Sequence, residues 1–371
     1  MMAKACLRLK WREGVCSGIP AKAFDAERML PSLRENSAYC SHGMRILPLL
    51  CATAVRRREI DWVREAFDMV KKVAALSYQG ADGMIYTPLQ FDADGQPGVF
   101  GMASRPSDTG IIIGGLVYAA DAFLRLGDEA SAQECADYGW RYAKTLIRMQ
   151  CENGEFYERY RYPSLEPSCG NRGTVNNWCM HVWNLQTILK RFGRQEEADA
   201  LRNLASRYVD SQLTKSPSIL KVCGGGEDVA DFGDALNTAS TLFTIKYILT
   251  GDEAYRKYTE QAMKKSWLMS CMYADMPEFF GIHGNSDLGI YYDQPNGIFS
   301  AGGMHDLTAI EAGLFAYHNL GIAFGRDLAD VQFCEGQRGD GYGYTEMSQF
   351  LFQGRESLGG FNVWRRGRLC L

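Results

Sequence analysis

The densest group of acidic residues in the sequence lies in the segment GGGEDVADFGDALN, which contains Glu227, Asp228, Asp231 and Asp234. Carboxyl groups that lie close together raise one another's pKa, and a carboxyl group that stays protonated near neutral pH can act as a general acid. The glycines before these acids leave the backbone open to the approach of a ligand. We therefore take Asp234 as a candidate catalytic acid or base and Asp228 as a candidate substrate-binding residue. The same acids can instead cap a helix or bind a structural cation.

A further acid, Asp108, lies in the segment RPSDTG, directly before a long apolar stretch. Hydrolysis of a glycosidic bond is one reaction that uses two carboxyl groups, one protonated to assist the leaving oxygen and one ionised to activate water or attack carbon. We assign Asp108 and Asp234 as the pair for such a reaction. The structural alternative for Asp108 is the capping of a helix N-terminus.

A third candidate group consists of His305 and Asp306 in the segment SAGGMHDLTAIE, where they follow a pair of glycines. A histidine beside an aspartate can act as a base or bind substrate hydroxyl groups. An ordinary helix start, with Asp306 as its cap, is the structural alternative.

Aromatic and basic residues in the same loop-rich part of the predicted fold as these acids suit a sugar ligand. In the segments NGEFYERYRYP and FFGIHGNSDLGIYYDQPNG, aromatic side chains alternate with polar ones. Sugars stack their C–H faces on aromatic rings while their hydroxyl groups take hydrogen bonds, and arginine can bind a carboxylate through two hydrogen bonds. Trp178 is a sugar platform if it faces a cavity and a core residue if it does not. The candidate substrate-binding residues are Arg105, Tyr157, Arg172, Trp178, Asp228 and Tyr291.

Short corners between helices recur along the chain, near residues 56–59 and at Gly127, Gly193, Gly251 and Gly325. Each glycine suits the left-handed conformation at a helix C-terminus, and the acids after it suit the first turn of the next helix. The segments before the corners are apolar on nearly all sides, whereas the segments after them carry charges at helical spacing along one face. Repeated pairs of an inner and an outer helix predict an α-helical toroid.

The connections that return from each outer helix to the next inner helix are long. They cover residues 78–107, 151–174, 214–232 and 271–305. Loops of this length inside a compact domain are usually functional, and all of them lie at the end where the inner helices begin. We therefore expect the functional site at this end.

The segment DTGIIIGGLVYAADAFLRLGDEAS, followed by YAKTLIRMQCENGEFYERY, resembles the repeating unit of the six-hairpin glycosidase superfamily. In that unit an inner helix, a Gly-Asp corner and an outer helix precede the motif Gln-x-x-x-Gly-x-Phe. The likeness covers residues 37–325 and implies an all-α fold, either an (α/α)6 barrel or an incomplete α/α toroid of five to six helical hairpins. It also implies a carbohydrate-active enzyme, because the superfamily includes glycoside hydrolases, polysaccharide lyases and sugar epimerases.

A glycoside hydrolase with a carboxylate acid/base pair, acting on an oligosaccharide or polysaccharide that contains uronic acid, is the function that we predict. The first alternative is a polysaccharide lyase or sugar epimerase. Asn177 and His181 lie four residues apart, hence on one face of a helix. By resemblance to toroid lyases, Asn177 would neutralise a uronate carboxylate, His181 would take the C5 proton, and Tyr291 or Tyr292 would donate to the leaving oxygen. The second alternative is a non-catalytic toroid that binds a glycan or a protein.

The repeats predict one α/α-toroid domain over residues 1–371, with the hairpins in residues 37–326. Five corners are clear, so a sixth hairpin is completed by the segment before Ser37 or the toroid is incomplete. Residues 327–371 are rich in glycine and aromatic residues, and we predict that this tail is partly β.

The composition narrows the class of protein further. With 46% hydrophobic and 23% charged residues, the chain of 371 residues is typical of a soluble globular protein. The net charge of −4 and the shortness of basic runs such as residues 56–58 argue against nucleic-acid binding. The most apolar segment is interrupted by Asp121, which argues against a membrane span.

Twelve cysteines without a C-x-x-C pair predict free buried thiols and indicate neither a zinc ribbon nor a redox motif. We expect no metal site in the catalytic centre and no cofactor. The first residues lack the hydrophobic segment of a secretory signal. We therefore expect a cytoplasmic protein, or an exported one whose signal has been removed.

Overall fold

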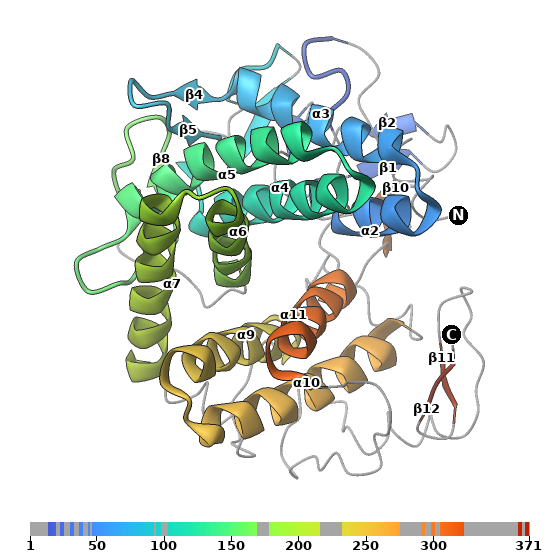
Figure 1. Ribbon diagram of the computed structural model, residues 1–371. Coiled ribbons are helices and arrows are strands. Elements are labelled where there is room, and N and C mark those ends of the chain that lie inside the picture. Colours follow the sequence, from blue (N-terminus) through green and yellow to red (C-terminus); the bar gives the residue numbers. More distant parts are fainter. Residues whose placement is uncertain are drawn as a thin grey trace. The chain divides into compact units, whose positions relative to one another are not determined.

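Figure 1 shows the computed structural model of the chain. It describes residues 14–19, 23–25, 30–32, 37–39, 44, 47–92, 94–97, 103–168, 178–215, 232–274, 291–293, 298–300, 305–322, 363–365 and 368–370. The chain forms two compact units. Unit 1 comprises Met1–Thr174, His181–Tyr208 and Tyr292–Gly302, and unit 2 comprises Val175–Met180, Val209–Tyr291 and Gly303–Leu371.

Helices dominate both units, and the described residues contain nine of them. In chain order they are α2 (Leu47–Arg57), α3 (Ile60–Leu76), α4 (Pro106–Leu126), α5 (Glu129–Met149), α6 (Cys179–Arg191), α7 (Gln195–Lys215), α9 (Phe232–Thr250), α10 (Glu253–Ala274) and α11 (His305–Leu320). Short corners join α2 to α3, α4 to α5, α6 to α7 and α9 to α10. The predicted fold class, all-α and built of helical hairpins in the manner of an α/α toroid, is confirmed.

A residue in the left-handed conformation ends the first helix of each of these hairpins. Gly127, Gly193 and Gly251 have φ angles of 86°, 72° and 72°, as predicted, and Arg58 takes the same conformation at the first corner with φ 57°. Asp128 then caps α5, because its side chain accepts a hydrogen bond from the amide of Ser131.

The last corner differs from the prediction. Helix α11 ends at Leu320, and the left-handed residue is Gly321, with φ 69°. Gly325, where the sequence analysis places the corner, lies outside the described residues. The apolar run GIAF continues past the end of the helix, so hydrophobic periodicity alone does not reveal the break.

Helix α4 is the centre of unit 1, where it contacts α2, α3 and α5. Its side chains are buried on almost all sides, whereas α5 buries one face and exposes charges on the other. A Cβ on Gly115 would lie 2.8 Å from Leu47, so a glycine lets α2 approach closely. Among the described residues, α4 alone is long and apolar enough to cross a membrane, but 72% of its most apolar window is buried inside the protein, as in a core helix.

In unit 2, α9 contacts both α10 and α11, and α10 contacts α11. Met263 of α10 forms a buried cluster with Ala312 and Ala316 of α11. The ring of Phe243 in α9 lies 5.4 Å, between centroids, from the ring of Tyr258 in α10. The helices of this unit therefore bury their apolar faces against one another.

The described strands are short and lie outside the helical hairpins. A four-stranded sheet has the order β2 (Leu30–Ser32), β1 (Ala23–Asp25), β10 (Ile298–Ser300) and β9 (Tyr291–Asp293). Four strand pairs complete the set: β3 (Ser37–Tyr39) with β6 (Gln90–Asp92), β4 (Tyr78–Gln79) with β5 (Ile85–Tyr86), β7 (Ala103–Ser104) with β8 (Tyr160–Arg161), and β11 (Val363–Arg365) with β12 (Arg368–Cys370). The last pair agrees with the predicted β content of the tail. No local pattern in the sequence predicts the four-stranded sheet, because the sheet pairs Phe24 with Phe299, which lie far apart along the chain.

Two return loops, one after α3 and one after α5, share the same hydrogen-bonded turn. Each contains a left-handed glycine, Gly83 or Gly154, with φ 80° or 85°. The amide after the glycine donates to the side chain before it, from Met84 to Asp82 Oδ1 and from Glu155 to Asn153 Oδ1, at 3.2 Å in both cases. The Gln-x-x-x-Gly part of the resemblance motif therefore occurs twice, followed by Phe156 in Gln150-x-x-x-Gly154-x-Phe156 and by Ile85 instead of Phe in Gln79-x-x-x-Gly83-x-Ile85.

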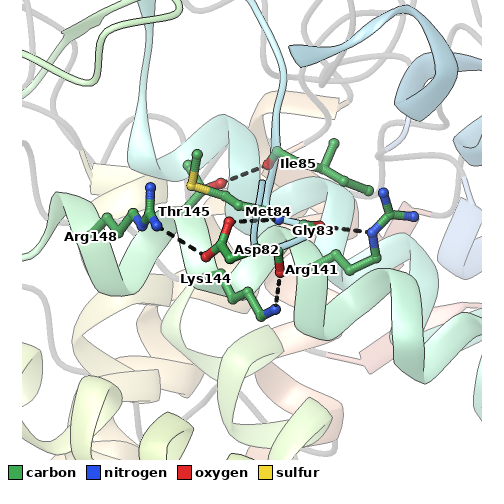
Figure 2. A network of polar contacts seen from close by, with 8 residues as sticks. All are labelled: Asp82, Gly83, Met84, Ile85, Arg141, Lys144, Thr145 and Arg148. Carbon is green, nitrogen blue, oxygen red and sulfur yellow. Dashed lines mark hydrogen bonds and ion pairs between the residues drawn. The ribbon is translucent and has the colours of Figure 1, made fainter. Parts of the chain in front are cut away.

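Each of these loops is held by the next outer helix. Side chains of α5 bind the first loop (Figure 2). Arg207 of α7 binds the second, because its Nη2 donates to the carbonyl oxygens of Cys151 at 2.9 Å and Glu152 at 2.6 Å. Each outer helix therefore positions the return loop that follows the outer helix before it: α5 holds the loop after α3, and α7 holds the loop after α5.

Replacement of Gly154 by alanine tests the contact between the second loop and α7. Both Gly154→Ala and the control Gly127→Ala force a side chain into a left-handed backbone, which costs about 1 kcal/mol. A Cβ at Gly127 meets nothing within 4 Å, whereas a Cβ at Gly154 would lie 2.3 Å from the carbonyl oxygen of Arg207. We expect Gly154→Ala to lower the free energy of unfolding, measured with urea, by about 2 kcal/mol more than the control does. Equal losses would show that the loop is not held against α7.

Candidate functional site

Arg105 and Asp108 form an ion pair at the start of α4. The guanidinium donates from Nε to Oδ2 of Asp108 at 2.9 Å and from Nη2 to Oδ1 at 3.2 Å. The side chain of Asp108 is 6% exposed and that of Arg105 is 29% exposed. A contact with two hydrogen bonds is the strong form of an arginine–carboxylate pair, and it compensates the loss of water around the buried carboxylate.

The local sequence explains why this pair forms. Helix α4 begins at Pro106, earlier than the apolar pattern predicts, because proline has a fixed φ and lacks the N–H that a first helical residue leaves unused. Arg105 is the extended residue before the helix, and Asp108 falls in its first turn, where a negative charge suits the helix dipole. Asp108 is therefore not the N-cap residue, and its carboxylate binds Arg105.

The strand pair β7–β8 leads directly into the ion pair. Ser104 of β7 lies opposite Tyr160 of β8 in an antiparallel ladder, and Arg105 is the next residue along the chain. The hydroxyl of the buried Tyr160 donates to the carbonyl oxygen of Met149 at 2.6 Å and accepts from the amide of Tyr157 at 3.0 Å. The structure thus brings Arg105, Asp108 and the loop of Tyr157 into one region of unit 1.

Tyr157, a candidate sugar platform, lies in the loop before β8 and is half-buried. Its ring and the Tyr160 ring meet edge to face, with 6.0 Å between the centroids and 81° between the planes. The ring of Tyr157 is therefore held against a buried support in a residue that is only partly buried, which suits a stacking platform.

His181 lies in the first turn of α6 and is 4% exposed. Its imidazole lies against α4, where a Cβ on Gly114 would be 2.7 Å from the ring atoms Cε1 and Nδ1. The ring meets that of Tyr118, which is only partly buried, edge to face with 6.4 Å between the centroids. The absent side chain of Gly114 therefore provides the space for a histidine beside a tyrosine.

Trp178, directly before α6, is 2% exposed. This is the environment of the core alternative, and the role of Trp178 as a sugar platform stays a prediction. Burial raises the pKa of the neighbouring Cys179 thiol, so this residue does not supply a thiolate nucleophile at neutral pH. Within the described residues, no group of three or more histidine, cysteine or acidic side chains is placed to hold a metal ion.

The other predicted residues are described by their backbone alone or lie outside the described residues. Asp234 lies in the first turn of α9, His305 and Asp306 begin α11, and Tyr291 and Tyr292 lie in β9. Arg172, Asn177 and Asp228 lie outside the described residues. Asp234, His305 and Asp306 therefore lie in the first turns of helices. Their catalytic roles and the pairing of Asp108 with Asp234 stay predictions.

Sequence reasoning missed three residues of this region: Tyr86, Gly114 and Tyr118. The glycine pair inside the apolar helix α4 was a signal, because glycine in a helix interior often marks the close approach of a neighbour. Tyr86 follows the repeated Gln-x-x-x-Gly motif, so comparison of the two loops indicates its importance. No local pattern indicates that Tyr118 meets His181.

A double-mutant cycle tests the strength of the Arg105–Asp108 pair. Arg105→Met keeps the aliphatic stem but leaves the buried carboxylate without its guanidinium, so we expect the free energy of unfolding to fall by about 3 kcal/mol. Adding Asp108→Leu should restore at least about 1 kcal/mol of this loss, because the buried charge is then gone. Strictly additive losses in urea unfolding would contradict the coupling of the two side chains.

Gly114→Ala tests the contact between α4 and His181. The new methyl group meets a buried ring that cannot turn away easily, and we expect a loss of about 2 kcal/mol in unfolding free energy. The double variant Gly114→Ala/His181→Ala should be less destabilised than the sum of the two single variants. If both changes simply add, the imidazole does not occupy the space beside Gly114.

No protein-family model matches the sequence, and no curated protein matches it. Among solved structures, the chain is similar to a polysaccharide lyase with a TM-score of 0.44 and 12% identity, over 72% of this chain and 35% of the lyase chain. It is also similar to a D-mannose isomerase with a TM-score of 0.39 and 11% identity, over 86% of this chain and 96% of the isomerase. At these TM-scores the likeness carries no argument about the site or the reaction.

Proposed function

We propose that the protein is a carbohydrate-active enzyme whose saccharide substrate binds at the end of unit 1 where α4 begins. The Arg105–Asp108 pair is the observation that carries the proposal. It joins a buried carboxylate to a partly exposed guanidinium at the head of the central helix of the unit. A convergence of charged side chains beside an aromatic return loop is typical of a substrate site.

Hydrolysis of a glycosidic bond is the reaction that we propose. Asp108, with a guanidinium on both oxygens, fits the ionised member of the carboxylate pair, which takes a proton from the attacking water. Its small exposed area suits contact with a water molecule rather than with a sugar ring. The protonated member gives its proton to the leaving oxygen, and Asp234, His305 and Asp306 stay candidates from the sequence alone for the group that supplies this proton.

A uronic acid is the substrate unit that suits Arg105. The guanidinium is partly exposed beside Asp108, and arginine binds carboxylates with defined geometry. Tyr157 supplies an aromatic face one strand away. Arg172, Asp228 and Tyr291 remain proposed binding residues for the rest of the saccharide.

A polysaccharide lyase or sugar epimerase is the second candidate, and the contact between His181 and Tyr118 favours it. Elimination at a uronate needs a base for the C5 proton and an acid for the leaving oxygen. A histidine and a tyrosine with 6.4 Å between their ring centroids supply both types of group. Tyr118 therefore joins Tyr292 as a candidate for the acid, with Asn177 as the proposed partner of the carboxylate.

Incubation with a panel of saccharides separates these candidates. The panel contains polysaccharides with uronic acid and the unsaturated oligosaccharides that lyases release from them, and ultraviolet absorbance and reducing ends are followed together. New reducing ends without a rise in absorbance, or a fall in absorbance on the unsaturated oligosaccharides, would support hydrolysis. A rise in absorbance on a polymer would mean elimination and would support the second candidate. No change on any substrate would overturn a uronate-directed hydrolase or lyase and would favour an epimerase, which changes neither signal, or a toroid that only binds a glycan or a protein.

The variant Asp108→Asn tests the proposed base on any substrate that the panel identifies. We expect kcat to fall about a hundredfold or more, because the amide cannot accept the proton of the attacking water. Asp121→Asn is the matched control, since Asp121 lies in the same helix and pairs with Arg125 at 2.7 Å on the surface. Turnover of the control should equal that of the wild type. Near-normal turnover by Asp108→Asn would remove Asp108 from the mechanism.

A further inference from the structure

We infer that Tyr86 is a positioning residue for the candidate site. Its hydroxyl holds β8 in place and, through the β7–β8 ladder, sets the position of Arg105 and Asp108. The catalytic consequence of this inference rests on the proposed function, whereas the contacts themselves do not depend on any substrate.

The hydroxyl of Tyr86 contacts both residues of β8. Tyr86 is fully buried, and its Oη donates to the carbonyl oxygens of Tyr160 at 3.3 Å and Arg161 at 3.2 Å. One hydroxyl hydrogen shared between two carbonyl groups forms a three-centre hydrogen bond. The ring also lies against that of Tyr162, with 5.2 Å between the centroids. Because a buried hydroxyl group is costly to leave without a partner, these contacts resist movement of β8 away from Tyr86.

The backbone that carries Tyr86 is itself held by α5, as Figure 2 shows. Thr145 Oγ1 donates to the carbonyl oxygen of Ile85, the residue before Tyr86, at 2.6 Å. Three basic side chains of the same helix bind the turn that precedes it: Arg141 to the carbonyl of Gly83 at 2.8 Å, Lys144 to the carbonyl of Asp82 at 2.5 Å, and Arg148 to the Asp82 carboxylate at 3.1 Å. Tyr86 therefore ties β8 to a long, well-packed helix.

The strands between Tyr86 and the ion pair have little strength of their own. β7 and β8 contain two residues each, and so short a ladder makes few hydrogen bonds. Arg105 directly follows β7, and its carbonyl oxygen accepts the amide hydrogen of Asp108 at 3.0 Å. A shift of β8 therefore moves Arg105, the residue directly before α4, together with the guanidinium that binds Asp108.

Tyr86→Phe removes the hydroxyl group and keeps the ring that fills the core. The matched control is Tyr142→Phe, because Tyr142 is equally buried in the same unit and its hydroxyl accepts a hydrogen bond from Thr87 Oγ1 at 3.3 Å. Urea unfolding establishes that both variants fold. Amide hydrogen exchange of the full chain, followed by mass spectrometry, then reports the local stability of the strands.

We expect residues 103–108 and 158–168 to exchange about tenfold faster in Tyr86→Phe than in the wild type, and at the wild-type rate in Tyr142→Phe. Wild-type rates in Tyr86→Phe would overturn the inference. So would equal acceleration by the control, because any lost buried hydroxyl group would then have the same effect.

On a substrate that the saccharide panel identifies, Tyr86→Phe should lower kcat, because the bound substrate meets a displaced carboxylate, and should raise KM, because the displaced guanidinium of Arg105 holds the uronate less well. Unchanged kcat together with faster exchange would contradict the catalytic part of the inference. If no saccharide is turned over, the proposed function fails, and the exchange rates alone still decide whether Tyr86 positions β8.

Discussion

A carboxylate buried at the head of an almost fully buried helix is the constraint on which the rest of unit 1 depends. Removing the charge of Asp108 from water costs several kcal/mol unless a partner with good geometry compensates it. Arg105 meets this need from three residues earlier, and it can do so only because α4 begins between the two residues, at Pro106. The position of the ion pair therefore depends on the helix start and on the end of β7. Helix α4 in turn packs against α2, α3 and α5 in the core of the unit.

The return loops obey a second constraint, which concerns their backbone. Side chains of α5 and α7 donate hydrogen bonds mainly to backbone carbonyl oxygens of the loops, including those of Gly83, Ile85, Cys151 and Glu152. Backbone groups are present whatever the side chains are, so such contacts fix the path of a loop while leaving its side chains open to change. This explains how Tyr86 in the first loop and Tyr157 in the second can differ in role although the turns before them are alike.

Local signals account for the part of the fold that the sequence predicts. The left-handed glycines, the acids after them and the difference between apolar and one-faced helices are properties of short segments. They locate the first four corners correctly, whereas the last helix ends at Leu320, before the predicted corner. Such local signals do not predict features that depend on the pairing of distant segments, such as the strand pairing of Phe24 with Phe299.

The candidate site was likewise predicted only as far as local signals reach. Arg105 and Asp108 were both singled out, but as separate residues, because their contact depends on where the helix begins. The imidazole of His181 over Gly114 depends on the packing of α6 against α4, which no spacing within either segment indicates.

The central claim is that a saccharide binds where α4 begins, and hydrogen exchange with and without ligand tests it most directly. The Asp108→Asn variant is mixed with an excess of an oligosaccharide containing uronic acid, so that the ligand is not consumed, and exchange is compared across the whole chain. The account predicts slower exchange in residues 103–108 and 157–161, with the corner at residues 127–129 unaffected. Slower exchange confined to other segments, with residues 103–108 unchanged, would contradict it.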